Sequence, residues 1–226
     1  MGFTGFSDDA FGFYERLGAD NTRAFWQANK ADYQQYVRGP MDALLAALAA
    51  FGPFHVFRPY KDVRFAKDKT PYKDHIGAYG ESEGGAGHYV QLSASGMFVG
   101  SGYYDMATDQ LDRLRRAIDA DATGAEIVRL VAELERRGHT ITAMSALKTA
   151  PRGYPKDHPR IGLLRLKGLV ATREWPVSSW MHTRAAVKRI ADTWTAAGDL
   201  DAWLDTHVGP STLAPDDGEL ARFGPL

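Results

Sequence analysis

The stretch Asp62–Lys73, "DVRFAKDKTPYK", concentrates positive charge in a chain whose formal net charge is −1. From position 58 to position 73 the cationic side chains are Arg58, Lys61, Arg64, Lys67, Lys69 and Lys73, and only Asp62 and Asp68 oppose them. A guanidinium offers a planar fork to carboxylate or phosphate, and ammonium groups add point charges around it. Thr70-Pro71 is expected to bend this basic block into an arc. We therefore predict an anion site whose ligands are Arg58, Arg64, Lys67, Lys69, Tyr72 and Lys73.

A second stretch, "KTAPRGYPKDHPR" over residues 148–160, has the same character. We expect this proline-rich loop to meet the basic block, so that Arg152 joins the anion site and Asp62 or His158 transfers protons. Neighbouring residues of an extended chain point to opposite sides, so Asp157 is not expected to orient His158. The alternative interpretation is a rigid crossover in which the aspartate caps a turn.

Other interpretations of the basic block remain open at the level of sequence. Asp62, Asp68 and Asp74 can neutralise part of it, which would make it a salt-bridge cluster that stabilises the fold. An open patch would instead serve as a nucleic-acid or protein interaction module, whereas a pocket would favour a small phosphate- or carboxylate-bearing molecule. General nucleic-acid binding is not expected, because a net charge of −1 opposes a polyanion outside the patch.

Several kinds of chemistry have no sequence signal. The chain has no cysteine, which excludes disulfides, cysteine-ligated zinc and thiol nucleophiles, and its seven histidines show no metal-ligand spacing. "GSGYY" around Ser101 is a lone G-x-G, more typical of close strand packing than of a dinucleotide loop. We assign no cofactor. The N-terminus lacks a signal-peptide pattern and no long apolar run occurs, so a soluble, cytoplasmic protein without a membrane partner is expected.

The elements that must position these residues are expected to form an α+β fold. Helical periodicity over the first fifty residues, with caps at Ser7 and Asn21 and a break at Gly39-Pro40, gives way to alternation from Phe54 to Tyr104. We predict a strand over residues 57–65, an edge or bulged strand because of Pro59, and a hairpin over 89–103 turning at 93–96.

The second half of the chain repeats the helix–strand order. We expect helices from Thr108 and from Thr123 to Gly138, a buried strand over residues 161–170, a helix carrying the stripe Val187, Ile190 and Trp194, and a last short helix at residues 203–204. No strand–helix–strand alternation demands a parallel sheet, so we predict an antiparallel or mixed central sheet covered by N- and C-terminal helices. Residues 1–208 are expected to form one domain, followed by a loose tail over 209–226.

Four segments together resemble a known family. "NTRAFWQANKADYQQYV", "DVRFAKDKTPYK", "GSGYYD" and "PRGYPKDHP", in this order and spacing, are similar to the microbial family catalogued as domain of unknown function 2461. The resemblance runs from about Phe6 to Val208, and its most specific part is the central block. The family pattern has Trp before Phe where this chain has Phe25 before Trp26. The resemblance implies no activity, substrate or cofactor.

Overall fold

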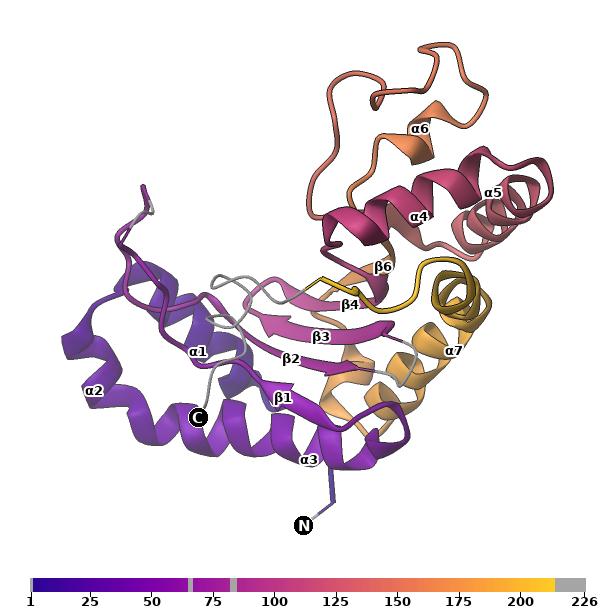
Figure 1. Ribbon diagram of the computed structural model, residues 1–226. Helices are drawn as coiled ribbons and strands as arrows, with labels where there is room; N and C mark the ends of the chain where they lie inside the picture. Colours follow the sequence, from indigo (N-terminus) through magenta and orange to yellow (C-terminus); the bar gives the residue numbers. More distant parts are fainter. Residues whose placement is uncertain (1, 65–66, 82–84, 214–226) are drawn as a thin grey trace.

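The computed structural model describes residues 2–64, 67–81 and 85–213, and these form an α+β fold around one sheet. The sheet is antiparallel throughout, with the order β1-β2-β3-β4-β6-β5 (Figure 1). Its strands are β1 (Phe54–Val56), β2 (His75–Glu81), β3 (Gly87–Ser93), β4 (Gly96–Tyr103), β5 (Thr140–Thr142) and β6 (Leu169–Pro176). The predicted fold class is therefore confirmed, and every strand pair is of the antiparallel kind.

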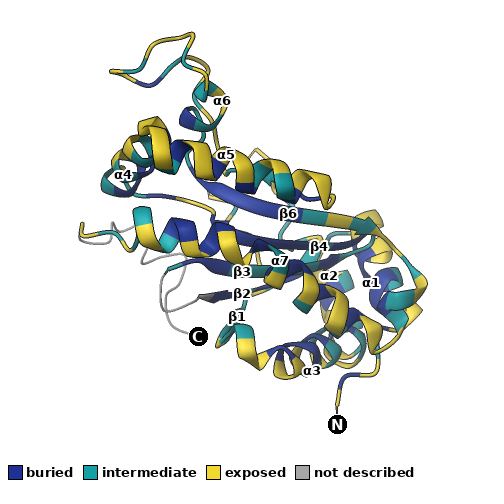
Figure 2. Ribbon diagram, turned by 90° about the vertical axis from the view of Figure 1, so that its right-hand side faces the viewer, coloured by how far each residue is buried: buried dark blue, intermediate teal, exposed yellow. Residues whose placement is uncertain are grey.

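The helices come from both ends and from the middle of the chain. They are α1 (Asp8–Ala19), α2 (Arg23–Asp32), the π-helix η1 (Tyr33–Arg38), α3 (Gly39–Ala47), the 3₁₀-helix η2 (Ala49–Phe51), α4 (Thr108–Asp119), α5 (Asp121–Arg136), α6 (Ile161–Leu164), the 3₁₀-helix η3 (Ser179–His182) and α7 (Ala185–His207). Figure 2 shows buried strands beneath helices whose outer surfaces are exposed.

One face of the sheet carries both hydrophobic clusters. Met97 and Val99 of β4 belong to a cluster with α1, α2, α3 and the start of α7, and Tyr103 belongs to a cluster with α4, α5 and the end of α7. Alternate residues of a strand share one face, so the helices of both clusters pack on the same side. The predicted stripe on α7 is confirmed, because Ile190 and Trp194 are buried and Val187 packs beside them.

The G-x-G of β4 serves close strand packing, as predicted. Gly102 has φ +135°, and a Cβ atom at this position would lie 2.2 Å from the carbonyl oxygen of Leu169 in β6. Only glycine adopts this conformation at low cost and allows the two backbones to approach. The hairpin of β3 and β4, with its turn at residues 93–96, is also confirmed.

Two expectations for the N-terminal helices are wrong. Thr22, not Asn21, caps α2, because its Oγ1 accepts a hydrogen bond from the Phe25 N–H at 3.2 Å. The chain also does not break at Gly39-Pro40: the π-helix η1 joins α2 to α3 without interruption. Pro40 lies in the first turn of α3, directly after the π-helix η1. The wider π-helical turn accommodates a residue that has no backbone N–H to donate.

Three strand and helix predictions also need correction. The prediction of a strand over residues 57–65 is wrong for residues 57–64, because β1 ends at Val56. Phe65 lies outside the described residues. Pro59 and Pro71 each remove a ladder donor there. Residues 161–164 form the short helix α6 instead of a strand, and β6 begins only at Leu169. Trp203 and Leu204 belong to the continuous 23-residue α7.

A buried carboxyl group lies where α7 crosses the sheet. Asp201 is 8% exposed, and its Oδ2 accepts a hydrogen bond from the hydroxyl of Ser101 in β4 at 2.5 Å. His88 of β3, directly opposite Ser101, has its Nε2 4.0 Å from the same oxygen. Burial raises the pKa of Asp201 to about 7. The hydrogen bond from Ser101 lowers this pKa, and the nearby Asp205 raises it further.

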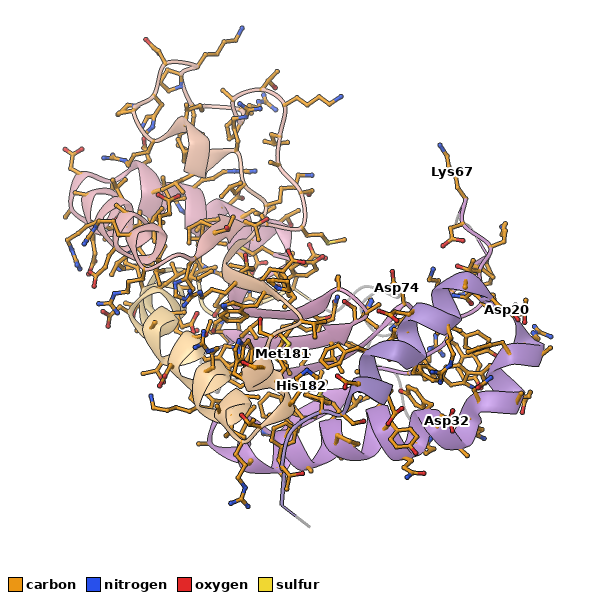
Figure 3. All side chains as sticks on the ribbon, turned by 180° about the vertical axis from the view of Figure 1, so that it is seen from behind. Asp20, Asp32, Lys67, Asp74, Met181 and His182 are labelled. Carbon is orange, nitrogen blue, oxygen red and sulfur yellow. The ribbon has the colours of Figure 1, made fainter. Side chains whose placement is uncertain are left out.

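The N-terminal segment is joined to the region just before α7. The Phe6 N–H donates to the Met181 carbonyl at 2.9 Å, and His182 Nδ1 lies 2.9 Å from the Phe6 carbonyl oxygen. Figure 3 shows Met181 and His182 between α7 and α1. Phe3 and Phe6 are consequently buried in the first cluster.

Candidate anion-binding site

The basic block connects β1 to β2 and projects away from the sheet (Figure 1). Its two sides are joined by the Lys61 N–H to the Pro71 carbonyl at 2.9 Å and by the Lys73 N–H to the Pro59 carbonyl at 2.8 Å. Lys67 lies near the outer end, pointing away from the body of the molecule (Figure 3). The block is thus a protruding two-sided ribbon, and Thr70-Pro71 lies on its second side, opposite Lys61, instead of forming its outer end.

The acids of the block are fully engaged. Asp62 accepts hydrogen bonds from Arg64, with Nη2 to Oδ2 at 2.6 Å, and Asp68 accepts one from Lys61 at 2.7 Å. The hydrogen bonds from Arg64 lower the pKa of Asp62 to about 2, which makes this carboxylate a poor proton acceptor at neutral pH. Salt-bridge pairing therefore explains two of the six cations.

The remaining cations have no carboxylate partner in the described part of the chain. Lys69 donates to the Val63 carbonyl at 2.9 Å, and Lys73 is half-buried with its ammonium 5.0 Å from the centroid of the Phe57 ring. Burial, and then Arg58, lower the pKa of Lys73. Arg58 and Lys67 are exposed. The block is thus a protruding surface rather than a cage around one anion.

Tyr72 is a packing residue, not an accessible ligand. Its side chain is 2% exposed and its ring is stacked on Trp26 of α2, with centroids 4.4 Å apart and planes 9° apart. Asn21 binds the backbone of Tyr72 twice: Nδ2 donates to the carbonyl at 3.0 Å, and Oδ1 accepts from the N–H at 3.1 Å. The base of the basic block is therefore attached to the start of α2.

We expect Asn21→Ala to lower the free energy of unfolding by about 1–3 kcal/mol, because the backbone groups of the buried Tyr72 lose their partners. Urea denaturation measures the change. The neighbouring exposed Asp20 supplies the control, since Asp20→Ala should change stability by no more than about 0.5 kcal/mol. Equal effects of both substitutions would show that the double hydrogen bond does not stabilise the fold.

The basic block and the proline-rich loop do not meet, so the predicted shared site is wrong. The block joins β1 to β2 at one edge of the sheet, whereas the loop joins β5 to β6 at the other edge. Figure 1 and Figure 3 both show the two segments well apart. The strand order, which the sequence does not reveal, separates them, and Arg152 does not join Arg64 or Lys69.

Both ring nitrogens of His158 contact other groups of the protein. Its Nε2 lies 3.1 Å from Asp119 Oδ1 at the end of α4, and its Nδ1 accepts a hydrogen bond from the Arg160 N–H at 3.0 Å. Asp157 does not orient it, as expected, and Asp119 takes that place. Because both ring nitrogens are engaged, His158 is positioned to hold the proline-rich loop against α4.

A different cluster of basic residues surrounds a cavity of about 470 Å³ beside α7. Its charged and polar lining comprises Arg137 and His139 after α5, Arg173 of β6, and Lys188, Arg189, Asp192 and Thr193 of α7. Four cations thus face one carboxylate in a concave site within the size range of ligand pockets. We call it the α5–α7 cavity.

Two arginines of the α5–α7 cavity are held by tryptophans. The guanidinium of Arg173 lies over the Trp175 ring and that of Arg189 over the Trp180 ring, each 5.0 Å from the centroid. A cation over an aromatic ring is attracted to the ring electrostatically, and this contact does not use the N–H groups of the guanidinium as hydrogen-bond donors to an oxygen. Neither arginine has a carboxylate partner among the residues described, whereas Arg137 pairs with Glu133 and Lys188 with Asp192.

The turn that ends α5 places His139 in this cavity. Gly138 has φ +83°, and the His139 N–H donates to the Leu134 carbonyl at 2.9 Å. The side chain is 5% exposed, its Nδ1 lies 3.3 Å from the same carbonyl, and its Nε2 forms no hydrogen bond with the described part of the chain. Burial is the main cause of its lowered pKa; the nearby Arg173 and Arg137 add to it, while the Leu134 and Thr193 carbonyls oppose it.

Sequence reasoning missed the α5–α7 cavity because its residues come from three distant segments, each of which looks ordinary. Arg137 and Lys188 pair with acids on their own helices, and such pairs are typical of solvated helix faces. The available signal was Arg173, an arginine that directly follows the four buried residues of β6 and stands two positions before Trp175.

Among residues 2–64, 67–81 and 85–213, no group of three or more histidine, aspartate or glutamate side chains is placed to hold a metal ion. No helix in these ranges has the length and apolar character needed to cross a bilayer.

Comparisons with known proteins identify the family without an activity. A search of the curated proteins and a search of the solved structures each found no match. The family model for conserved hypothetical proteins, DUF2461, matches residues 9–203, which include the basic block, the proline-rich loop and the α5–α7 cavity. The chain therefore belongs to the DUF2461 family of conserved hypothetical proteins.

Proposed function

We propose that the protein binds a small molecule bearing a phosphate or carboxylate group, and that the anionic group lies in the α5–α7 cavity. The observation that carries this proposal is the pair Arg173 and Arg189, each placed over a tryptophan ring, which line a concave site and have no carboxylate partners among the described residues. The contact with tryptophan restricts both side chains before binding, which reduces the entropy lost when they bind an anion.

Calorimetric titration with inorganic phosphate, and separately with citrate, tests the proposal. We expect saturable binding of at least one probe, and we expect Arg173→Gln and Arg189→Gln each to weaken it by about 10- to 100-fold, since a hydrogen bond to a charged group contributes about 1.5–3 kcal/mol. Thermal unfolding verifies that both variants remain folded.

The matched control removes charge from the basic block. Arg58→Gln with Lys67→Gln should leave phosphate or citrate binding unchanged, because both residues lie outside the α5–α7 cavity. If the control abolishes binding while the cavity variants retain it, the anion binds at the block. Absence of saturable binding of either probe by the wild type would overturn the proposal.

A second candidate function uses the basic block as an interaction surface for an acidic protein. Its support is the protruding shape of the block and the exposure of Arg58, Lys67 and Tyr60, the last being 48% exposed. A ribbon with unpaired cations fits an anionic surface better than it encloses a small molecule.

General DNA binding is not part of this second candidate. Non-specific affinity needs several phosphate contacts at once, and the net charge of −1 opposes them outside the block. In a gel-shift assay at moderate ionic strength we expect no tight, sequence-independent complex. Such a complex, lost on Arg58→Gln with Lys67→Gln, would replace the acidic-protein candidate with nucleic-acid binding.

A further inference from the structure

The proton on His139 determines what the α5–α7 cavity can bind. With Nδ1–H directed to the Leu134 carbonyl, the neutral imidazole keeps Nε2 as an acceptor, and this buried atom has no hydrogen-bond partner among the described residues. A fully ionised anion also carries only acceptors. The neutral ring therefore does not attract such an anion, whereas the imidazolium attracts it through its charge.

The charges around His139 favour the neutral ring while the cavity lacks an anion. The charges of Arg173 and Arg137 lower the pKa of His139, and Lys188 and Arg189 line the same cavity from α7. The acids in this region are Glu133 and Asp192, and each already pairs with a cation of its own helix. Burial acts in the same direction as the cations, because it penalises the charged ring.

An anion in the cavity reverses this balance. It places negative charge next to Arg173, Arg189 and His139, and a nearby opposite charge favours the protonated ring. Resting on the proposed function, we infer that the α5–α7 cavity binds its anion together with one proton, which resides on Nε2 of His139. The ligand class is thus a compact oxyanion whose oxygens accept hydrogen bonds from the guanidinium groups of Arg173 and Arg189 and whose charge lies near the buried imidazolium.

Sulfate is the appropriate probe, because it stays fully ionised over the working pH range and brings no proton of its own. Calorimetric titration in two buffers of different ionisation enthalpy gives the number of protons taken up for each sulfate bound. We expect uptake approaching one proton near neutral pH. Between about pH 5.5 and 7.5, across the range in which histidine titrates, the affinity should fall by up to tenfold for each unit of pH.

His139→Gln isolates the role of the ring. The glutamine amide offers a neutral donor near the position of Nε2 but cannot take up a proton. We expect it to bind sulfate with at most a tenfold loss of affinity at the lowest pH, with no proton uptake and little dependence on pH. As an independent measurement, the ¹⁵N chemical shifts of His139 should report the Nδ1–H tautomer in the free protein and the imidazolium in the sulfate complex.

The outcomes separate this inference from the proposed function. If the wild type binds sulfate and Arg173→Gln weakens it, but proton uptake is zero or is unchanged by His139→Gln, the proton-coupled mode is wrong and the anion site stands. If sulfate, phosphate and citrate all fail to bind, both proposals fall. If His139→Gln does not fold, the ¹⁵N chemical shifts of the wild type still test the inference. A neutral His139 ring in the wild-type sulfate complex would overturn it.

Discussion

The free energy of unfolding is expected to fall by about 4 kcal/mol as the pH rises from about 4 to about 7, because of the single carboxyl group of Asp201. Its pKa is about 7 in the folded protein, against an ordinary value of 3.8. Between these two values the folded state holds a proton that the unfolded state has lost, so each unit of pH lowers stability. Below about pH 4 both states are protonated and the effect disappears.

Asp201→Asn should remove most of this pH dependence. The asparagine carbonyl can still accept the hydrogen bond from Ser101, and its side chain carries no charge to desolvate. Urea denaturation at pH 5 and pH 8 measures the change, and the variant should lose much less stability than the wild type between the two values. The exposed Asp199 of the same helix provides the control, since Asp199→Asn should keep the wild-type dependence. Equal pH dependence of wild type and Asp201→Asn would show that Asp201 is ionised in the folded protein.

Gly102→Ala is expected to destabilise the protein by about 3 kcal/mol or more, or to prevent folding. A methyl group at this position meets the Leu169 carbonyl oxygen at 2.2 Å and the Val170 Cα at 2.9 Å, so β4 and β6 must separate. The positive φ of 135° adds backbone strain for alanine. Soluble yield and the urea midpoint measure the loss.

Gly100, two positions earlier in β4, provides a matched control. A Cβ atom there lies 3.3 Å from Val170 Cγ1 and 3.4 Å from Thr172 Cγ2, and these side-chain atoms can shift slightly. Gly100→Ala should therefore cost much less than Gly102→Ala. Similar losses at both positions would mean that the general lack of room between β4 and β6, and not the backbone approach at Gly102, limits substitution.

Local sequence patterns correctly predicted the elements in which buried residues recur at a regular spacing along the chain. The β3–β4 hairpin and the Ile190–Trp194 stripe follow from periods of two and of about 3.6 residues, and the structure confirms both. The alternating pattern gave a wrong prediction where the backbone lacks the N–H donors that a strand requires. The alternation over residues 57–64 resembles a strand, but Pro59 and Pro71 lack the N–H groups that a continuous ladder needs.

The location of the candidate site depended on strand order, which local patterns do not contain. The basic block and the proline-rich loop look alike in sequence, yet β1 and β5 occupy opposite edges of the sheet and separate them. Arg137, Arg173 and Arg189 show the opposite relation, because residues that share no sequence pattern lie together in the fold. They are dispersed in the sequence, and only the packing of α5 and α7 beside β6 brings them to one cavity.

The attachment of the first residues to the segment before α7 has a consequence during protein synthesis. Phe6 and His182, which share a hydrogen bond, are 176 residues apart. At translation rates of about 5–20 residues per second, the N-terminal segment therefore waits roughly 9–35 s for its partner to be made. Throughout that interval Phe3, Phe6 and Phe11 lack part of the surface that later buries them, and the nascent chain presents an aromatic segment of the kind that ribosome-associated chaperones bind.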